Sequence, residues 1–134
     1  MKYLLDTNTL SDYLKGDKSV IKNLHYNSPD DLAISSITKW EIAYGLQKKP
    51  SLKKKYAKQL HEIYTLTNDL PFDSSIAHTA GYVRNNLRLA GTPIGIPDVL
   101  IASTALFFDL TVITSNTKHF KQIKELNLIN WRKD

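Results

Sequence analysis

The segment from Val99 to Phe108 places the strongest constraint on the fold, because it predicts a helix that is apolar on nearly every face. A helix of this kind must be buried by other elements. Pro97 fits its first turn, where a missing backbone N–H costs nothing. Asp98 stands at the start of the same helix, an unusual position for a charge. The fold must therefore cover this helix and still accommodate a carboxylate at its N-terminal end.

Short apolar segments predict strands that alternate with helices along the chain. They lack the polar alternation of a half-exposed strand, which indicates burial on both faces, as in a parallel sheet. The predicted strands are 3–5, 32–35, 70–72, 111–114 and 128–131. The predicted helices are 10–14, 20–24, 38–46, 51–64, 74–90, 97–108 and a short one near 120–123. This order of elements indicates an α/β fold with a mainly parallel sheet.

Two of the predicted helices show a face that suits packing. In helix 38–46 we expect Trp40, Ala43 and Tyr44 to face the core. Helix 51–64 is amphipathic, and its lysines point mostly outward. The residues that it should turn inward are Leu52, Tyr56, Leu60, Ile63 and Tyr64.

The composition narrows the possible kinds of site. The chain of 134 residues has the length of one domain, which we assign to residues 1–134. It has no cysteine, which excludes disulfides, thiolate zinc sites and cysteine nucleophiles. Lys and Arg number 18 against 13 Asp and Glu, so a formal charge of +5 mildly favours anionic partners. No secretory signal or membrane-spanning run is evident, so we expect a cytoplasmic protein with no membrane partner.

Three carboxylates occupy equivalent positions in this pattern. Asp6 follows the first strand, Glu41 lies near the start of the helix after the second, and Asp98 begins the apolar helix. Loops beyond the carboxyl ends of parallel strands are where such folds bind ligands, so these acids should share a crevice with Asn116. Negative charges at close range repel one another, and a cation bound among them offsets that repulsion. Oxygen ligands with no histidine or cysteine expected nearby favour Mg²⁺ or Mn²⁺, which can activate water against a phosphodiester.

Each of these residues also has a purely structural interpretation. Glu41 is the third residue after Thr38, the spacing of a capping box. Asp98 could favour the helix dipole, and Asp6 could be a turn residue that accepts from its own backbone. Asn116 is of a type that commonly forms turns. The coincidence of all four positions is what favours a metal-dependent nuclease.

Four motifs, in this order, resemble the PIN domain and specifically the VapC toxins of bacterial toxin–antitoxin pairs. They are LLDTNTLSDYLKG, ISSITKWEIAYG, GTPIGIPDVLIASTAL and TVITSNTKHF, and they span almost the whole chain. The resemblance implies a three-layer α/β/α fold with a short-stranded sheet. It also implies a Mg²⁺-dependent endoribonuclease that cleaves structured RNA, commonly tRNA. Its partner would be a small VapB-like antitoxin, with promoter DNA bound only through the antitoxin and a homodimer inside the complex.

The resemblance also implies roles for individual residues. Asp6, Glu41 and Asp98 would hold the metal, and Asn116 would take the fourth catalytic position. Many PIN domains have aspartate there, and an amide brings no charge for a second cation. The residues that we expect to contact substrate are Asn8, Arg84, Arg88 and Thr114. The lysines of helix 51–64 are the rival basic surface.

Two other classes of protein compete with the nuclease. A Mg²⁺-dependent phosphotransfer domain also places acids at strand ends, but a receiver needs an acidic pair after its first strand, and a haloacid-type phosphatase needs Asp-x-Asp where this chain has Asp6-Thr7-Asn8. A non-catalytic, basic nucleic-acid-binding module would use its lysines on the phosphate backbone. Only the enzymes should depend on a divalent metal.

Overall fold

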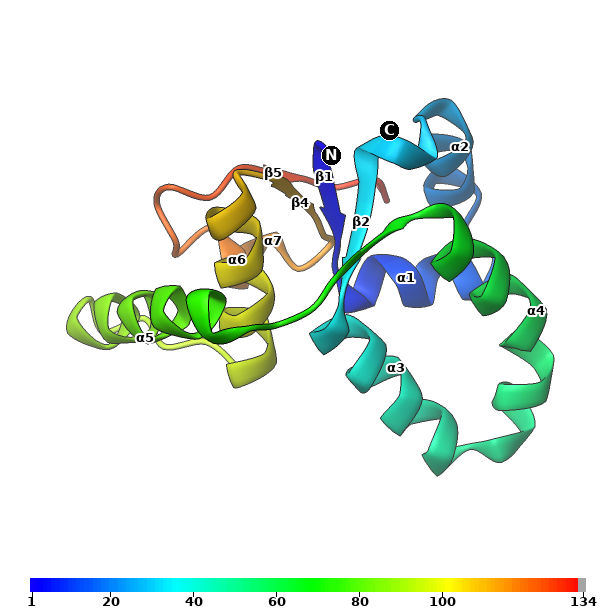
Figure 1. Ribbon diagram of the computed structural model, residues 1–134, viewed down its shortest axis with the longest axis horizontal. Coiled ribbons are helices and arrows are strands. Elements are labelled where there is room, and N and C mark those ends of the chain that lie inside the picture. The colour runs from blue at the N-terminus through cyan, green and yellow to red at the C-terminus, as the bar shows by residue number, and fades with distance from the viewer. Residues whose placement is uncertain (133–134) are drawn as a thin grey trace.

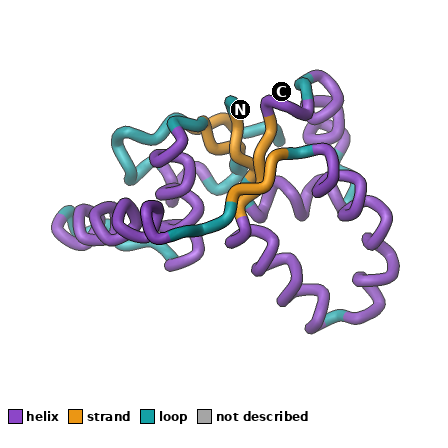
Figure 2. Tube along the Cα trace, in the orientation of Figure 1, coloured by secondary structure: helices purple, strands orange, loops and turns teal. Residues whose placement is uncertain are grey.

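A five-stranded parallel sheet lies at the centre of the computed structural model, which describes residues 1–132. The strand order is β3-β2-β1-β4-β5. Helices α1 to α4 lie on one side of the sheet and α5 to α7 on the other (Figure 1), and Figure 2 shows how short the strands are beside the helices. The predicted three-layer α/β/α fold with a parallel sheet is confirmed.

The elements have the following bounds. The strands are β1 (Tyr3–Leu5), β2 (Leu32–Ser35), β3 (Asn68–Leu70), β4 (Thr111–Ile113) and β5 (Leu128–Ile129). The helices are α1 (Thr7–Leu14), α2 (Lys18–Tyr26), α3 (Ser36–Lys48), α4 (Pro50–Leu66), α5 (Ser74–Leu89), α6 (Ile96–Phe108) and α7 (Thr117–Phe120), with a 3-10 turn at Pro29–Asp31. Within the described residues, no helix has both the length and the apolar character needed to cross a membrane.

Alternate side chains of the central strands pack into two separate hydrophobic cores, one on each face of the sheet. Leu4 of β1 and Val112 of β4 pack with α5 and α6. Leu5 and Ile113, one position further along the same strands, pack with α1, α3 and α4. Successive side chains of a strand point to opposite faces, so a sheet covered on both sides needs apolar residues at every position. This is why the strands show no polar alternation in the sequence.

Helix α6 is buried through its middle and exposed at its ends. Residues Val99 and Ile101–Ala105 are buried, as the apolar run predicts. Phe107 and Phe108 in the last turn are 46% and 36% exposed, so the prediction of burial is wrong for that turn. The helix ends at once, because Asp109 takes a left-handed conformation with φ of 55°. The two rings meet edge to face on the surface.

The predicted core face of α3 is wrong. Trp40 and Tyr44 are 59% and 60% exposed, and Ala43 is exposed as well. The buried residues are Thr38 and Ile42, which lie one turn apart on the opposite side of the helix. Successive residues of a helix are about 100° apart, so a shift of two positions turns the face away from the core.

The third strand also starts earlier than predicted, at Asn68, and ends at Leu70. Pro71 has no N–H to continue the ladder, and the Phe72 N–H donates to Ser36 Oγ at 3.0 Å. At the other end, the Asn68 side chain donates to the Leu32 carbonyl at 2.9 Å, which ties β3 to β2. The inward residues predicted for α4 are confirmed, with Tyr56, Leu60 and Ile63 buried and Leu52 and Tyr64 partly buried.

Candidate active site

Asp6 is a buried carboxylate at the carboxyl end of β1. It is 2% exposed and caps α1, where Oδ1 accepts from the Thr9 N–H at 2.8 Å. The structural interpretation as a backbone-bonded residue is therefore confirmed, but it does not account for the burial. The pKa of Asp6 is raised to about 6, mainly because the carboxylate is buried; the nearby charge of Asp98 adds to the rise, and hydrogen bonds from Thr114 and Thr9 oppose it. Asp6 and Asp98 therefore interact electrostatically.

The carboxyl ends of β1 and β4 are joined directly beside Asp6. The Asp6 N–H and the Thr9 hydroxyl both donate to the Ile113 carbonyl, at 3.1 and 2.8 Å. Thr114 follows β4 and is fully buried, and its hydroxyl oxygen accepts from the Asn116 N–H at 2.8 Å. The predicted contact between Thr114 and substrate stays a prediction, and in this structure the side chain is buried. Its hydroxyl holds Asp6 and the Asn116 loop in place.

Asp98 lies in the first turn of α6, and its side chain is 25% exposed. Its Oδ2 lies 3.4 Å from Asn116 Nδ2 and 3.3 Å from His119 Nδ1. The Asn116 Nδ2 and His119 Nδ1 atoms are 3.0 Å apart. The predicted neighbourhood of Asp98 and Asn116 is thus present, and a histidine joins it.

His119 was not among the residues predicted for the site. One signal was available: it follows Asn116 by three positions, the spacing that puts two side chains on the same face of a helical turn. The short helix α7 (Thr117–Phe120) produces that turn. The expected helix near 120–123 would have placed His119 before the helix instead.

Glu41 lies in the second turn of α3 and faces α1. Its Oε1 accepts from the Thr7 hydroxyl at 2.5 Å, and Thr7 Oγ1 is 3.2 Å from the Thr38 hydroxyl. The capping-box interpretation is wrong, because α3 is capped by Ser35, whose Oγ accepts from the Thr38 N–H at 3.2 Å. Glu41 therefore connects α3 to α1, the helix that Asp6 caps.

The donor groups suit a divalent cation held by few protein ligands. Among the described residues, no three His, Cys, Asp or Glu side chains form a group that could hold a metal, so Asp6, Glu41 and Asp98 do not converge as one cluster. Mg²⁺ usually binds one or two carboxylates and keeps several waters. Asp6 and Asp98 supply such a pair, and a cation would relieve their repulsion.

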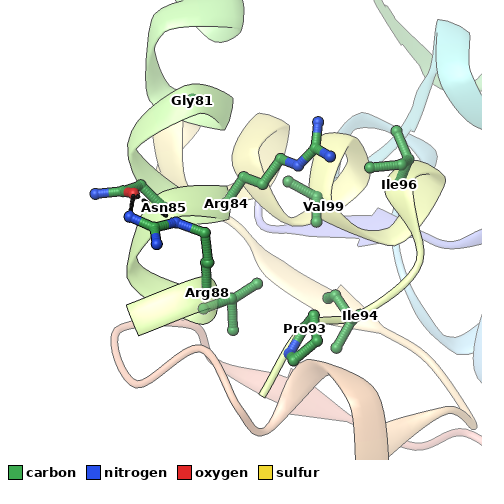
Figure 3. A pocket seen from close by; sticks show the side chains of 9 residues that line it. Gly81, Arg84, Asn85, Arg88, Pro93, Ile94, Ile96 and Val99 are labelled. Atoms are coloured by element: carbon green, nitrogen blue, oxygen red, sulfur yellow. Dashed lines mark hydrogen bonds between the residues drawn. The ribbon is translucent and has the colours of Figure 1, made fainter. Parts of the chain in front are cut away.

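Arg84 and Arg88 lie on α5 beside the loop that leads to Asp98. They line a groove of about 450 Å³ with an apolar floor that includes Ile94, Ile96 and Val99. Figure 3 shows the Arg84 side chain extending across Val99 toward Ile96. Arg88 instead bonds to Asn85 Oδ1 through Nε and Nη2, at 3.2 and 2.9 Å. Asn8 is exposed in the first turn of α1.

The comparisons with known proteins all indicate the same family. The PIN domain family matches residues 3–126. The chain is 35% identical to ribonuclease VapC2 of Rickettsia felis, over 99% of this chain and all of that protein. It is 30% identical to the tRNA(fMet)-specific endonuclease VapC of Salmonella typhimurium, over 98% of each chain.

Solved structures agree with this result. A crystal structure of VapBC2 from Rickettsia felis bound to a promoter DNA fragment contains a chain that superposes with a TM-score of 0.89 at 33% identity, covering 98% of this chain and 99% of that one. DNA-bound VapBC from Salmonella typhimurium also gives 0.89, at 30% identity and 98% of both chains. The fold, the acids at the strand ends and these similarities together show that the chain belongs to the PIN domain family, among its VapC ribonucleases.

Proposed function

We propose that this protein is a Mg²⁺-dependent endoribonuclease of the VapC toxin type, which acts in the cytoplasm as a single domain of residues 1–134 and cleaves structured RNA such as tRNA. The observation that carries the proposal is the pairing of a buried carboxylate, Asp6, with a partly exposed one, Asp98, at the end of the sheet where β1 and β4 meet. The names of the VapC relatives supply the substrate class.

The residues divide the work by their position. Asp6 and Asp98 would hold the Mg²⁺ ion, and Mn²⁺ could take its place. A bound divalent cation would polarise the phosphate of the RNA and activate a water molecule. Asn116 can orient the water or a phosphate oxygen through its amide. Glu41 is fixed by Thr7 and can accept a proton at its carboxylate. Thr114 holds Asp6 and the Asn116 backbone in register.

RNA would run from this site across the α5 side of the molecule. Arg84 lies closest to the start of α6, over an apolar floor that an unstacked base could contact. Arg88 and Asn8 would add contacts to the phosphates and sugars. These groups position the substrate and take no part in the chemistry.

A small VapB-like antitoxin would neutralise the toxin. The solved neighbours of this fold include VapBC complexes, one bound to a fragment of promoter DNA and another bound to DNA. A partner that inserts an arginine beside Asp6 and Asp98 would replace the charge of the cation. We extend the same analogy to a homodimer within the complex and to DNA binding through the antitoxin alone.

The direct test is cleavage of total RNA and of purified tRNA by the isolated protein, with Mg²⁺ and with EDTA. Wild type should cleave only with the metal, and Asp98→Asn should not cleave. Glu41→Gln keeps an acceptor for the Thr7 hydroxyl, so it should fold normally and lose about 10²-fold or more in rate if Glu41 transfers a proton. Cleavage that persists in EDTA, or in Asp98→Asn at saturating Mg²⁺, would reject the metal-dependent mechanism.

A further inference from the structure

His119 brings an imidazole into contact with the proposed metal ligand Asp98. Its Nδ1 lies 3.3 Å from Asp98 Oδ2 and 3.0 Å from Asn116 Nδ2, and its side chain is half exposed. An exposed pair between histidine and carboxylate contributes little to stability, generally less than about 1 kcal/mol. Stability alone therefore gives a weak reason for this arrangement.

The spacing of the three side chains matches that of ligands around one ion. Bonds from a metal to nitrogen or oxygen are about 2.0–2.2 Å long, so adjacent ligands of an octahedral ion lie roughly 3 Å apart. The three separations among Asp98 Oδ2, Asn116 Nδ2 and His119 Nδ1 are 3.0, 3.3 and 3.4 Å. A half-turn of the Asn116 amide exchanges its nitrogen for its oxygen, which can coordinate a metal.

The three groups are held by two separate elements, α6 for Asp98 and α7 with its cap for Asn116 and His119. Asp98 is fixed in the first turn of α6, whereas His119 belongs to α7. The Asn116 backbone is anchored by the buried Thr114 hydroxyl, and Phe120, the residue after His119, is fully buried in the core. The imidazole is therefore presented at Asp98 by a short helix with a fixed end.

We propose that His119 is a nitrogen ligand of the catalytic cation at Asp98, with water rather than a third acidic or imidazole side chain in its remaining positions, and that the site therefore prefers transition metals such as Mn²⁺ or Co²⁺ over Mg²⁺. The inference rests on the proposed function, since it assumes that a divalent cation binds at Asp98. Imidazole suits transition metals, whereas Mg²⁺ strongly prefers oxygen. The sequence alone suggests an oxygen-only site, and the histidine changes that expectation.

The test is pulsed electron paramagnetic resonance on Mn²⁺-loaded protein at pH 8, which detects ¹⁴N coupled directly to the ion. Wild type should show this coupling. His119→Glu, which offers oxygen in place of nitrogen, should bind Mn²⁺ without it. His61→Gln is the matched control, because it removes an exposed histidine of α4, and it should keep the coupling.

Calorimetry supplies a second readout that needs no RNA. The ratio of the Mn²⁺ affinity to the Mg²⁺ affinity should fall about tenfold or more in His119→Glu, the lower end of what even outer-shell partners of a metal contribute. An unchanged ratio would overturn the proposal, and so would wild-type protein that binds Mn²⁺ without ¹⁴N coupling.

Failure of this inference is distinguishable from failure of the proposed function. If wild type binds Mn²⁺ through oxygen only and still cleaves RNA with Mg²⁺, the role of His119 is overturned and the nuclease stands. If neither Mn²⁺ nor Mg²⁺ binds, and RNA is not cleaved, both are overturned.

Discussion

Asp6 combines two requirements that oppose each other electrostatically. As the cap of α1 it is buried near the Thr9 N–H, and as the proposed metal ligand it would carry charge beside Asp98. Without a cation the charged form is unfavourable, which is why the pKa of Asp6 rises from 3.8 to about 6. The difference corresponds to roughly 3 kcal/mol. The charge of Asp6 therefore destabilises the metal-free protein at neutral pH.

The sign of the effect on stability follows from proton counts. Between about pH 4 and pH 6 the folded state keeps the proton of Asp6, whereas the unfolded state has released it. The free energy of unfolding must fall as pH rises through this range and stay lower above it. Asp6→Asn keeps the helix cap and removes the charge. It should be more stable than wild type by up to about 3 kcal/mol at pH 8 in EDTA, and nearly equal to it at pH 3.

Urea unfolding at several pH values measures this difference. Asp73→Asn is the matched control, because Asp73 caps α5 in the same way but is exposed. This variant measures how much the replacement of a capping carboxylate by an amide changes the free energy of unfolding by itself. A gain in Asp6→Asn that does not vary with pH would show that desolvation of the carboxylate is not its cause.

For the individual site residues, the sequence predicted their places at the ends of strands and helices better than it predicted their side-chain contacts. Asp6, Asp98 and Asn116 were found because each flanks a strand or an apolar helix, and parallel strands bring their carboxyl ends to one edge of the sheet. Glu41 was correctly placed after the second strand, but its contact with Thr7 depends on where α3 begins. The His119 contact joins residues 21 positions apart and depends on the one-turn helix α7, which no periodic pattern can define.

Helix α5 contributes the basic groove, and its arginines differ in availability. Arg84 extends over the apolar floor, whereas Arg88 is bonded to Asn85 within the same helix. We expect Arg84→Ala with Arg88→Ala to weaken RNA binding and to make the salt dependence shallower. The slope of log K against log salt should change by about 0.7 for each phosphate that the protein no longer neutralises. Cleavage at saturating RNA should remain.

Fluorescence titrations of RNA at several salt concentrations measure the slope. Neutralising Lys53, Lys54 and Lys55, which are exposed on α4, is the matched control with a comparable reduction of positive charge. If the α4 lysines change the slope and the α5 arginines do not, the RNA runs over α4.

Most elements were predictable because the periodicity of apolar residues records burial. The errors in the predicted elements arose where something other than apolar periodicity decided the structure. In α3 the aromatic residues suggest a core face, but Thr38 and Ile42 occupy the inward positions. In β3 the missing N–H of Pro71 ends the strand two residues before the predicted end, Phe72.

The whole molecule is basic, with a formal charge of +5, although its proposed centre is acidic. A cationic surface attracts RNA, and an acidic crevice can attract a basic segment of a partner. We expect expression of the protein alone to arrest growth and co-expression of a VapB-like antitoxin to restore it. The purified complex should cleave no RNA, and Mg²⁺ should raise the melting temperature of the free protein but not that of the complex.

Growth curves and thermal melts of the two preparations check this prediction. The Asp98→Asn variant, which we expect to be inactive, controls for the burden of expression itself. Arrest that no co-expressed antitoxin relieves, or a complex that remains fully active, would contradict neutralisation at this site.

The strand order has a consequence for synthesis of the protein. The first strand to leave the ribosome, β1, ends at the centre of the sheet, between β2 and β4. A nascent chain that has reached α5 already contains Asp6 and Glu41 but lacks Asp98, Asn116 and His119. Because the ribosome adds residues from the N-terminus, the site cannot be complete before α6, β4 and α7 have been made. The two proposed metal ligands, Asp6 and Asp98, therefore cannot act together until the later part of the sheet has formed around β1.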